Sequence, residues 1–349
     1  MSRQVTIKEV AAHARVSYQT VSKVLNRQAR VSKETEERIW EAVQATGYRP
    51  NLIARSLRAR NSHMIGYSWA PAPPQQGNPI LDQFLQSMVD AGQAAGYHVL
   101  TFPYRAGKQW VEGYRDMIDS NRVDGFVLSS VEYDDPRIKL LQERNFPFVA
   151  FGRSNPDWDF PYVDVDGAAG MASVVDHLLA RGHTRIAALA WSEDSRVGNN
   201  RMEGFKAAMG SAGIHIRPEW IQRGEGVYKF GAEAASRLMQ LREEVRPTAI
   251  VAFNDFMAIG AMHAIHASGL QVGKQIAITG FDDIPLVQYL NPSLTSVRQP
   301  IWEIGQRVIS ILLGILNEQD GLNTQVLLKP RLIVRNSSGL EPASLIVPH

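Results

Sequence analysis

Apolar positions in the first fifty residues recur at the spacing of short amphipathic helices. Thr6 and Glu9 form a capping box in front of one apolar stripe, and Ser17 and Ser32 stand at the N-cap positions of two more. The pattern predicts three helices, covering residues 7–14, 18–26 and 32–47. Together they form a small all-α unit. Residues 52–60 are also helical in pattern, but they carry too little apolar surface to be stable alone.

From residue 63 onward, apolar runs of strand length alternate with helical segments. A first series predicts strands at 64–69, 97–102, 123–130 and 146–152, and a second series predicts them at 185–191, 220–224, 248–254 and 275–282. Such βαβ series form doubly wound parallel sheets, which bind ligands outside the carboxyl ends of their strands. Two series in tandem predict an α/β core with two lobes and a cleft between them.

Charge is distributed unevenly along the chain. Residues 1–60 contain 12 Lys/Arg and 5 Glu, a net charge of +7, whereas the remainder has 25 Lys/Arg and 30 Asp/Glu, a net charge of −5. A basic end on an acidic body is expected of a protein that touches nucleic acid, or an anionic membrane, through one end only. The N-terminal segment lacks the apolar stretch of a secretory signal, and no apolar run is long enough to span a membrane. We therefore expect a cytoplasmic protein rather than a secreted sugar-binding one.

The chain has no cysteine, which excludes disulfides, thiolate metal ligands and a cysteine nucleophile. His263 and His266 are spaced for one helix face, but no third ligand is indicated nearby, so we expect surface or core histidines and no metal or cofactor.

Several motifs resemble the lactose-repressor (LacI/GalR) family. The first are VTIKEVAAHARVSYQTVSKVLN, VSKETEERI and GYRPNLIARSL, and the similarity continues through MIGY, VDGFVLSS, RGHTRIA, FNDFMAIGA, ITGFDDI, LTSVRQP and PRLIVRNSSG. The resemblance implies a helix-turn-helix DNA-binding domain at 1–49, a hinge helix at 50–61, and a periplasmic-binding-protein-like core at 62–349. It places the N-lobe at about 62–160 and 292–323 and the C-lobe at about 161–291 and 324–349, with chain crossings near 160, 291 and 323.

In a helix-turn-helix the second helix enters the major groove of DNA. Gln19 can pair with adenine there, and Lys23 can reach the guanine acceptors, although the family more often has arginine at that position. The resemblance further implies that Leu57 wedges into the minor groove. The predicted contacts with DNA are Thr6, Ser17, Tyr18, Gln19, Thr20, Ser22, Lys23, Asn26, Asn51, Ala54 and Leu57.

Sugars are bound by planar side chains that bridge two hydroxyls and by aromatic rings that stack on the pyranose. Asn254 and Asp282 end predicted strands, and both match ligand-contacting positions of the family, as does Arg201, although helix capping or turn formation is the alternative for the first two. For the tryptophans the alternative is core packing. Many relatives have an aromatic residue near 224, where this chain reads Gly-Glu-Gly, and Tyr228 is the candidate substitute. The predicted effector contacts are Trp69, Arg105, Ser129, Arg153, Trp191, Arg201, Tyr228, Asn254, Asp282 and Gln299.

The sequence therefore predicts a homodimeric transcriptional repressor that binds pseudopalindromic double-stranded operator DNA under the control of a small sugar, the inducer. One alternative is a regulator of the same fold that responds to a phosphorylated metabolite, a nucleobase or a protein corepressor, because Arg105, Arg153 and Arg201 could hold an anion. The other is a glycoside hydrolase that uses paired carboxylates from Asp164, Asp166, Asp255 and Asp282. No G-x-S-x-G, Walker or HExxH motif is present, and an enzyme would leave the basic end unexplained.

Overall fold

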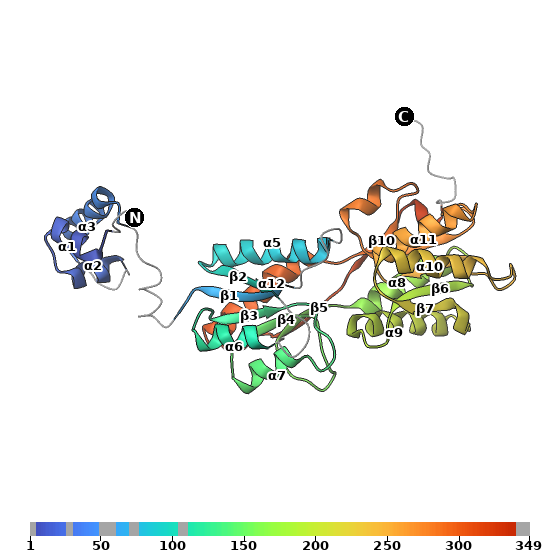
Figure 1. Ribbon diagram of the computed structural model, residues 1–349, viewed down its shortest axis with the longest axis horizontal. Helices are drawn as coiled ribbons and strands as arrows, with labels where there is room; N and C mark the ends of the chain where they lie inside the picture. Colours follow the sequence, from blue (N-terminus) through green and yellow to red (C-terminus); the bar gives the residue numbers. More distant parts are fainter. Residues whose placement is uncertain (1–4, 26–30, 49–60, 70–76, 104–110, 340–349) are drawn as a thin grey trace, which may run out of the picture. The chain divides into compact units, whose positions relative to one another are not determined.

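The computed structural model describes residues 5–25, 31–48, 61–69, 77–103 and 111–339, and the chain divides after Ser62 into two compact units (Figure 1). Most of the predicted hinge helix lies outside the described residues. So do five of the predicted contacts, namely Asn26, Asn51, Ala54, Leu57 and Arg105.

The first unit contains the three predicted helices, α1 (Ile7–Ala14), α2 (Tyr18–Leu25) and α3 (Lys33–Thr46). Each begins at its expected polar residue, and the Ser32 side chain, for example, accepts a hydrogen bond from the Thr35 N–H. Their inward stripes form one core from Val10, Ala11, Ala14, Val21, Val24, Ile39 and Ala42. The hydrophobic pattern thus fixes which side chains of α2 remain in solvent.

The second unit contains two six-stranded sheets. The first has the order β11-β5-β4-β3-β1-β2, and all its strands are parallel. The strands are β1 (Met64–Trp69), β2 (His98–Pro103), β3 (Gly125–Leu128), β4 (Phe148–Phe151), β5 (Tyr162–Val165) and β11 (Gln325–Leu328).

Helices cover both faces of this sheet because side chains alternate along its strands. Val127 packs in a core with α5 (Pro79–Ala94) and α12 (Ile301–Leu316). Its neighbours Phe126 and Leu128 pack on the opposite face, which is covered by α6 (Glu112–Asp119) and α7 (Pro136–Glu143) (Figure 1). We call this layered unit the N-lobe.

The second sheet has the order β12-β10-β9-β8-β6-β7, with only β10 and β12 antiparallel. Its strands are β6 (Ile186–Trp191), β7 (Ile221–Gly224), β8 (Ala249–Ala252), β9 (Ala277–Asp282), β10 (Thr295–Arg298) and β12 (Arg331–Ile333). The helices of this C-lobe are α8 (Gly167–Leu179), α9 (Arg196–Ser211), α10 (Tyr228–Met239) and α11 (Asp255–Ala267), with short 3-10 turns η1 (Pro218–Trp220), η2 (Pro285–Tyr289) and η3 (Asn336–Ser338). The predicted fold class is confirmed.

The crossings between the lobes come after β5, β10 and β11. These positions follow Val165, Arg298 and Leu328, a few residues later than the crossings expected near 160, 291 and 323. The reason is that each crossing segment first completes an edge or inner strand of the sheet it leaves. Within the described residues, no helix is both long and apolar enough to cross a membrane.

Candidate functional site

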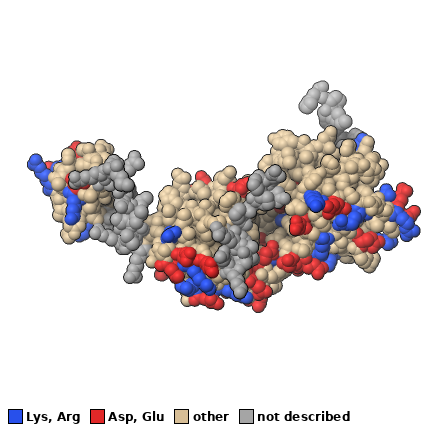
Figure 2. All heavy atoms as spheres, viewed as in Figure 1, with Lys and Arg blue, Asp and Glu red and all other residues tan. Residues whose placement is uncertain are grey.

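Helix α2 presents a polar face to solvent in the first unit. Tyr18 is 43% exposed and Gln19 and Lys23 are exposed, whereas Val21 and Val24 are buried beneath them. Figure 2 shows mainly Lys and Arg among the charged side chains on the visible face of this unit. A short helix with exposed hydrogen-bonding and cationic side chains can meet base edges and phosphates at once.

Other predicted DNA contacts in this unit make local hydrogen bonds. The Ser17 hydroxyl accepts a hydrogen bond from the Thr20 N–H at 3.1 Å and lies 2.8 Å from the Thr20 hydroxyl. The Thr6 N–H and hydroxyl both donate to the Glu9 carboxylate, at 2.6 and 3.1 Å. Ser22 is half-buried. Thr6 and Ser17 begin α1 and α2, and Ser17 thereby fixes how the exposed side chains of α2 are presented.

In the C-lobe, predicted effector contacts gather around Arg201, a buried residue of α9. An Asp282 carboxylate oxygen at the end of β9 lies 3.5 Å from its guanidinium and accepts a hydrogen bond from the Gln299 amide at 2.7 Å. The guanidinium carbon lies 5.0 Å from the centre of the Trp191 ring and 3.6 Å from that of Phe281. We call Arg201, Asp282, Gln299 and Trp191 the Arg201 cluster.

The sequence analysis did not identify Phe281. Phe281 lies in an apolar run that predicts a strand, and no local pattern in the sequence indicates that a cation will stack on its ring.

Burial sets the electrostatics of the Arg201 cluster. It lowers the pKa of Arg201, and Asp282, Asp164 and Asp255 oppose that shift in this order. The Asp282 side chain is 16% exposed. Burial raises the pKa of Asp282 to about 6, and the charge of Arg201 and the hydrogen bond from Gln299 act against it. The pair can accept and donate hydrogen bonds side by side, as two adjacent hydroxyls require.

The backbone that carries Asp282 is in the left-handed region, with φ of 113° at Asp282 and 52° at Asp283. Such conformations at non-glycine residues are strained and persist only where their surroundings hold them. The Asp283 carboxylate binds Arg298 and Arg335, each at 2.6 Å.

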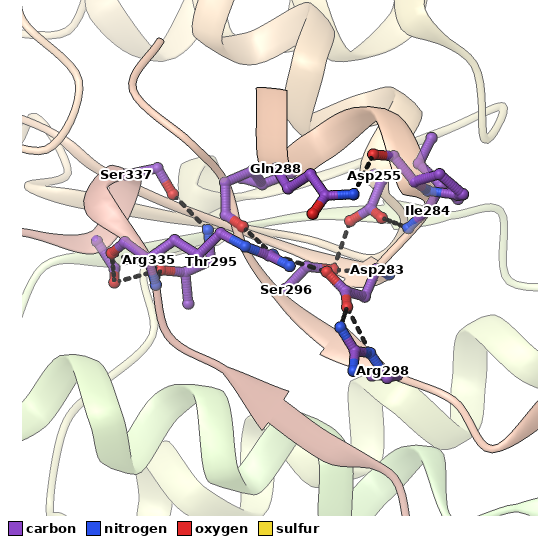
Figure 3. Close-up of polar contacts among 12 residues, drawn as sticks. Asp255, Asp283, Ile284, Gln288, Thr295, Ser296, Arg298, Arg335 and Ser337 are labelled. Atoms are coloured by element: carbon purple, nitrogen blue, oxygen red, sulfur yellow. Dashed lines mark hydrogen bonds and ion pairs between the residues drawn. The ribbon is translucent and has the colours of Figure 1, made fainter. Parts of the chain in front are cut away.

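The buried Asp255 accepts hydrogen bonds from Ile284 N at 2.8 Å and the Ser296 hydroxyl at 2.6 Å (Figure 3). Together the carboxylates of Asp255 and Asp283 fix the turn that presents Asp282. The sequence analysis missed this positioning role because the contacts are between residues distant in the chain.

Asn254 caps a helix and also contacts the loop before α10. Its amide oxygen accepts a hydrogen bond from Met257 N at 2.8 Å, at the start of α11, and its amide nitrogen donates to Gly226 O at 2.8 Å. A Cβ at Gly226 would lie 2.2 Å from Trp191 Nε1 and 2.9 Å from Asn254 Nδ2. Glycine therefore allows this loop to approach both side chains.

Arg153 lies at the carboxyl end of β4 and pairs with Asp164 at 2.7 Å. It lines a cavity of about 220 Å³ together with Ser154, Asn155, Pro156, Trp158, Phe160, Tyr162, Arg196 and Gln325. Arg196 was not predicted from the sequence. It comes from α9 of the C-lobe, and its guanidinium donates to Ser154 O at 3.0 Å. Residues of both lobes therefore meet at this cavity.

The remaining predicted effector contacts are not part of the Arg201 cluster. Trp69 is 49% exposed at the end of β1. Ser129 is buried, with its hydroxyl 2.9 Å from that of Tyr67. Tyr228 starts α10 and packs edge-on against His263, with ring centres 6.0 Å apart. Their proposed contacts with an effector stay predictions.

All four carboxylates considered for hydrolysis have partners within the fold, Asp282 through Arg201 and Gln299. Asp255 is buried, Asp166 caps α8 through Ala169 N at 2.9 Å, and Asp164 pairs with Arg153. None of the described residues forms a group of three or more His, Cys, Asp or Glu side chains placed to hold a metal ion. The site as described is suited to binding a polar ligand.

Two family models match the chain. Residues 6–51 match the bacterial regulatory proteins of the lacI family, and residues 175–338 match the periplasmic binding protein-like domain. The HTH-type transcriptional repressor PurR of Aliivibrio fischeri is 31% identical, over 95% of this chain and 98% of the relative.

Two solved structures share the fold over nearly the whole chain. The Lac repressor dimer bound to operator and the anti-inducer ONPF is 27% identical, covers 97% of this chain and 100% of its own, and has a TM-score of 0.85. The complex of the transcriptional regulator CelR with cellobiose is also 27% identical and covers 96% of this chain and 100% of its own, with a TM-score of 0.73.

Proposed function

Because the chain belongs to the LacI family of bacterial regulatory proteins and is a DNA-binding transcriptional repressor, we propose that a small carbohydrate, acting as inducer, controls its affinity for operator DNA. One helix-turn-helix domain covers only half of a pseudopalindromic site, so the proposed form on DNA is a homodimer. The related Lac repressor is a dimer on its operator.

For the DNA contacts, we propose that Gln19 and its exposed neighbours on α2 read base edges in the major groove. Gln19→Ala should weaken binding to a selected operator by about 1–3 kcal/mol, roughly 5- to 150-fold, and leave non-specific DNA binding unchanged. The matched control is Gln44→Ala, the same change at an exposed position of α3. Equal losses in the two variants would argue against α2 as the reading helix.

The proposed minor-groove wedge, Leu57, lies outside the described residues and rests on the family resemblance. Leu57→Ala should remove most operator affinity, because a wedged side chain offsets the cost of unstacking a base step. Thermal unfolding and effector affinity should be those of the wild type. Unchanged operator affinity, measured by fluorescence anisotropy, would contradict the proposal.

A single observation carries the sugar assignment. In the Arg201 cluster one carboxylate lies 3.5 Å from a guanidinium and accepts a hydrogen bond from an amide at 2.7 Å, beside an indole ring. Arg201 Nε is buried and has no hydrogen-bond partner among the described residues. Planar groups with spare donors and acceptors suit pairs of sugar hydroxyls, and the indole suits the apolar face of the ring. The related CelR structure holds cellobiose.

The test is operator release. An operator is first selected from random DNA with the full chain, and its complex is then titrated with a panel of monosaccharides and disaccharides. Release by one sugar, reduced by Asp282→Asn but not by Asp90→Asn on the N-lobe helix α5, is the expected result. If no sugar in the panel changes operator affinity, the sugar proposal fails while the repressor assignment stands.

A second candidate effector is an anionic or planar metabolite, and the cavity lined by Arg153 and Arg196 favours it. Two arginines beside Trp158 and Tyr162 can bind a phosphate or carboxylate group together with a stacked ring. Titrating the same operator complex with sugar phosphates and nucleobases separates the two candidates. A corepressor would tighten the complex, whereas an inducer would release it.

For the control of DNA affinity, we propose that α9 transmits effector binding. Its first residue, Arg196, donates its N–H to Glu132 of the N-lobe at 2.5 Å, and Arg201 lies later on the same helix. A ligand that moves Arg201 therefore acts on the contacts between the lobes. An effector weakens operator binding only by its preference for the low-affinity state, typically about 1–3 kcal/mol.

A further inference from the structure

A cavity of about 310 Å³ lies at the edge of the C-lobe sheet opposite to the Arg201 cluster. It is lined by Arg181, His183, Gly273, Lys274, Ala277, Ser338 and Gly339. His183 precedes β6 and Ala277 begins β9, so the cavity is at the amino ends of these parallel strands. Asp282, in contrast, ends β9. The cavity is therefore separate from the proposed effector site.

The described lining is basic and contains no carboxylate. Arg181 donates to His177 Nδ1 at 3.0 Å, and its Nε is buried without a hydrogen-bond partner among the described residues. Neither Arg181 nor Lys274 forms an ion pair within the described part of the chain, whereas the arginines at 217, 223, 298 and 335 of this lobe each pair with Asp or Glu. Arg181 as a whole is half-buried, but a buried N–H donor without an acceptor still costs free energy.

The histidines next to Arg181 are held neutral. Burial, followed by the charges of Arg181 and His183, lowers the pKa of His177 to about 4, and burial and Arg181 lower that of His183. Because Arg181 can only donate, His177 Nδ1 accepts, and Nε2–H donates to the Ser338 hydroxyl 2.8 Å away. The groups that face the two imidazoles are thus cationic or neutral.

We propose that this cavity binds a small dianionic oxyanion of the phosphate or sulfate type. Arg181 has an Nε–H without a partner among the described residues, and Lys274 supplies a second positive charge at the cavity. His183 lines the cavity beside them, and His177 contacts Arg181. Bound negative charge would offset the field of Arg181 and so favour protonation of His177. Anion binding is therefore linked to proton uptake and tightens as the pH falls toward the pKa of His177 in the complex.

The probe is sulfate, which keeps its charge over the range in which histidines titrate, added to the full-length protein at constant ionic strength with chloride as the balancing anion. Calorimetry should give saturable binding of one sulfate per chain. NMR of the imidazole rings should show that sulfate raises the pKa of His177 from about 4. Absence of saturable binding, or the same response to chloride alone, would overturn the proposal.

The variants locate the site. Arg181→Gln should weaken the binding of sulfate by about tenfold or more. The substitution should also raise the pKa of His177 in the absence of sulfate, and adding sulfate should then leave that pKa unchanged. Lys274→Gln, at an exposed position where folding is not at risk, should give a smaller loss. The control is Arg217→Gln, an exposed arginine of the same lobe that pairs with Glu219 at 3.6 Å. Wild-type affinity in both cavity variants, or an equal loss in the control, would overturn the assignment.

Discussion

Among the described residues, each lobe buries one arginine, and the two arginines are bonded very differently. Arg137, on α7 of the N-lobe, is 2% exposed, and Arg201, on α9 of the C-lobe, is 5% exposed. Arg137 Nη2 binds the Asp135 carboxylate at 2.6 Å and the carbonyls of Ser129 and Ser130 at 3.1 Å each, and its Nε also binds Asp135, at 2.9 Å. Its donors are used within the lobe.

The hydrogen-bond donors of Arg201 are only partly used. Its nearest carboxylate oxygen, on Asp282, is 3.5 Å away, one N–H donates to Phe253 O, and Nε has no partner among the described residues. Aromatic rings supply much of its surroundings. The full hydrogen bonding of Arg137 indicates a structural role, whereas the incomplete bonding of Arg201, beside the carboxyl end of β9, is what the proposed contact with a ligand requires.

The largest effect is expected at Arg137. Arg137→Met should lower the free energy of unfolding by about 3–5 kcal/mol, because it leaves the Asp135 carboxylate buried without its counter-charge. Urea denaturation measures the change. Effector affinity of the folded fraction should change far less than stability, because Arg137 contacts the Ser129 carbonyl but no residue of the Arg201 cluster.

The control for this variant is Arg144→Met, in the capping residue of the same helix. Arg144 is 45% exposed, and it pairs with Asp119 at 3.2 Å. Its loss should cost less than about 1 kcal/mol, as for other surface pairs. If the two variants lost similar amounts of unfolding free energy, the buried hydrogen bonds of Arg137 would contribute no more than an exposed ion pair does.

The next effect is expected at Arg201. Arg201→Lys keeps the positive charge beside Asp282 but removes the planar fork, so effector affinity should fall about 10- to 100-fold while the free energy of unfolding changes by about 1 kcal/mol. The effector is the compound that acts in the operator titration, and calorimetry gives its affinity.

Arg237→Lys is the matched control for this substitution. Arg237 lies on α10 of the same lobe, where its guanidinium donates to Gln222 Oε1 at 3.0 Å. We expect no change in effector affinity. If Arg201→Lys instead destabilised the fold strongly and bound the effector normally, the two buried arginines would have the same structural role.

The third prediction concerns pH. Burial raises the pKa of Asp282 to about 6, and effector hydroxyls that donate to this carboxylate require its ionised form. Below that pH the protein must release a proton on binding, so affinity should fall by up to about tenfold, or 1.4 kcal/mol, for each further pH unit. Above it, affinity should be level.

Asp282→Asn tests the origin of this dependence. The amide does not titrate, so the variant should bind more weakly and with little dependence on pH. Asp255 is the neighbouring carboxyl group whose pKa burial also raises, and it remains in the variant. An unchanged pH profile in Asp282→Asn would therefore assign the titration to another group such as Asp255.

Local signals predicted much of the fold. Thr6, Ser17 and Ser32 mark helix starts through their own side chains, and the apolar runs of the two βαβ series are long enough to identify as strands. The lobe crossings were placed too early because β5, β10, β11 and β12 were not predicted. Each has only three or four residues, and, unlike the equally short β3, β4 and β8, each includes polar or charged residues that break the apolar run.

The different hydrogen bonding of Arg137 and Arg201 could not be predicted from local sequence signals. Arg201 was identified through a family motif, but no pattern indicated that Arg137 would be buried. Asp135 and Arg137 are two residues apart at the start of α7, a spacing equally compatible with an exposed pair. Saturation depends on the carbonyls of Ser129 and Ser130, which the chain brings into reach only after β3 and α7 have packed.

The smallest effect is expected at Thr279, a buried residue of β9 whose hydroxyl has no partner among the described residues. Arg201 lies on α9 beside Asp282, which ends β9, whereas Thr279 lies within the strand, where no ligand can use the hydroxyl. Thr279→Val should therefore stabilise the fold by up to about 1 kcal/mol, since it removes an unsatisfied polar group while keeping the shape. Urea denaturation should show this, with effector affinity unchanged. If Thr279→Val instead lowered both stability and effector affinity, an unpartnered buried atom could not be used to distinguish a ligand-binding residue such as Arg201 from a structural one.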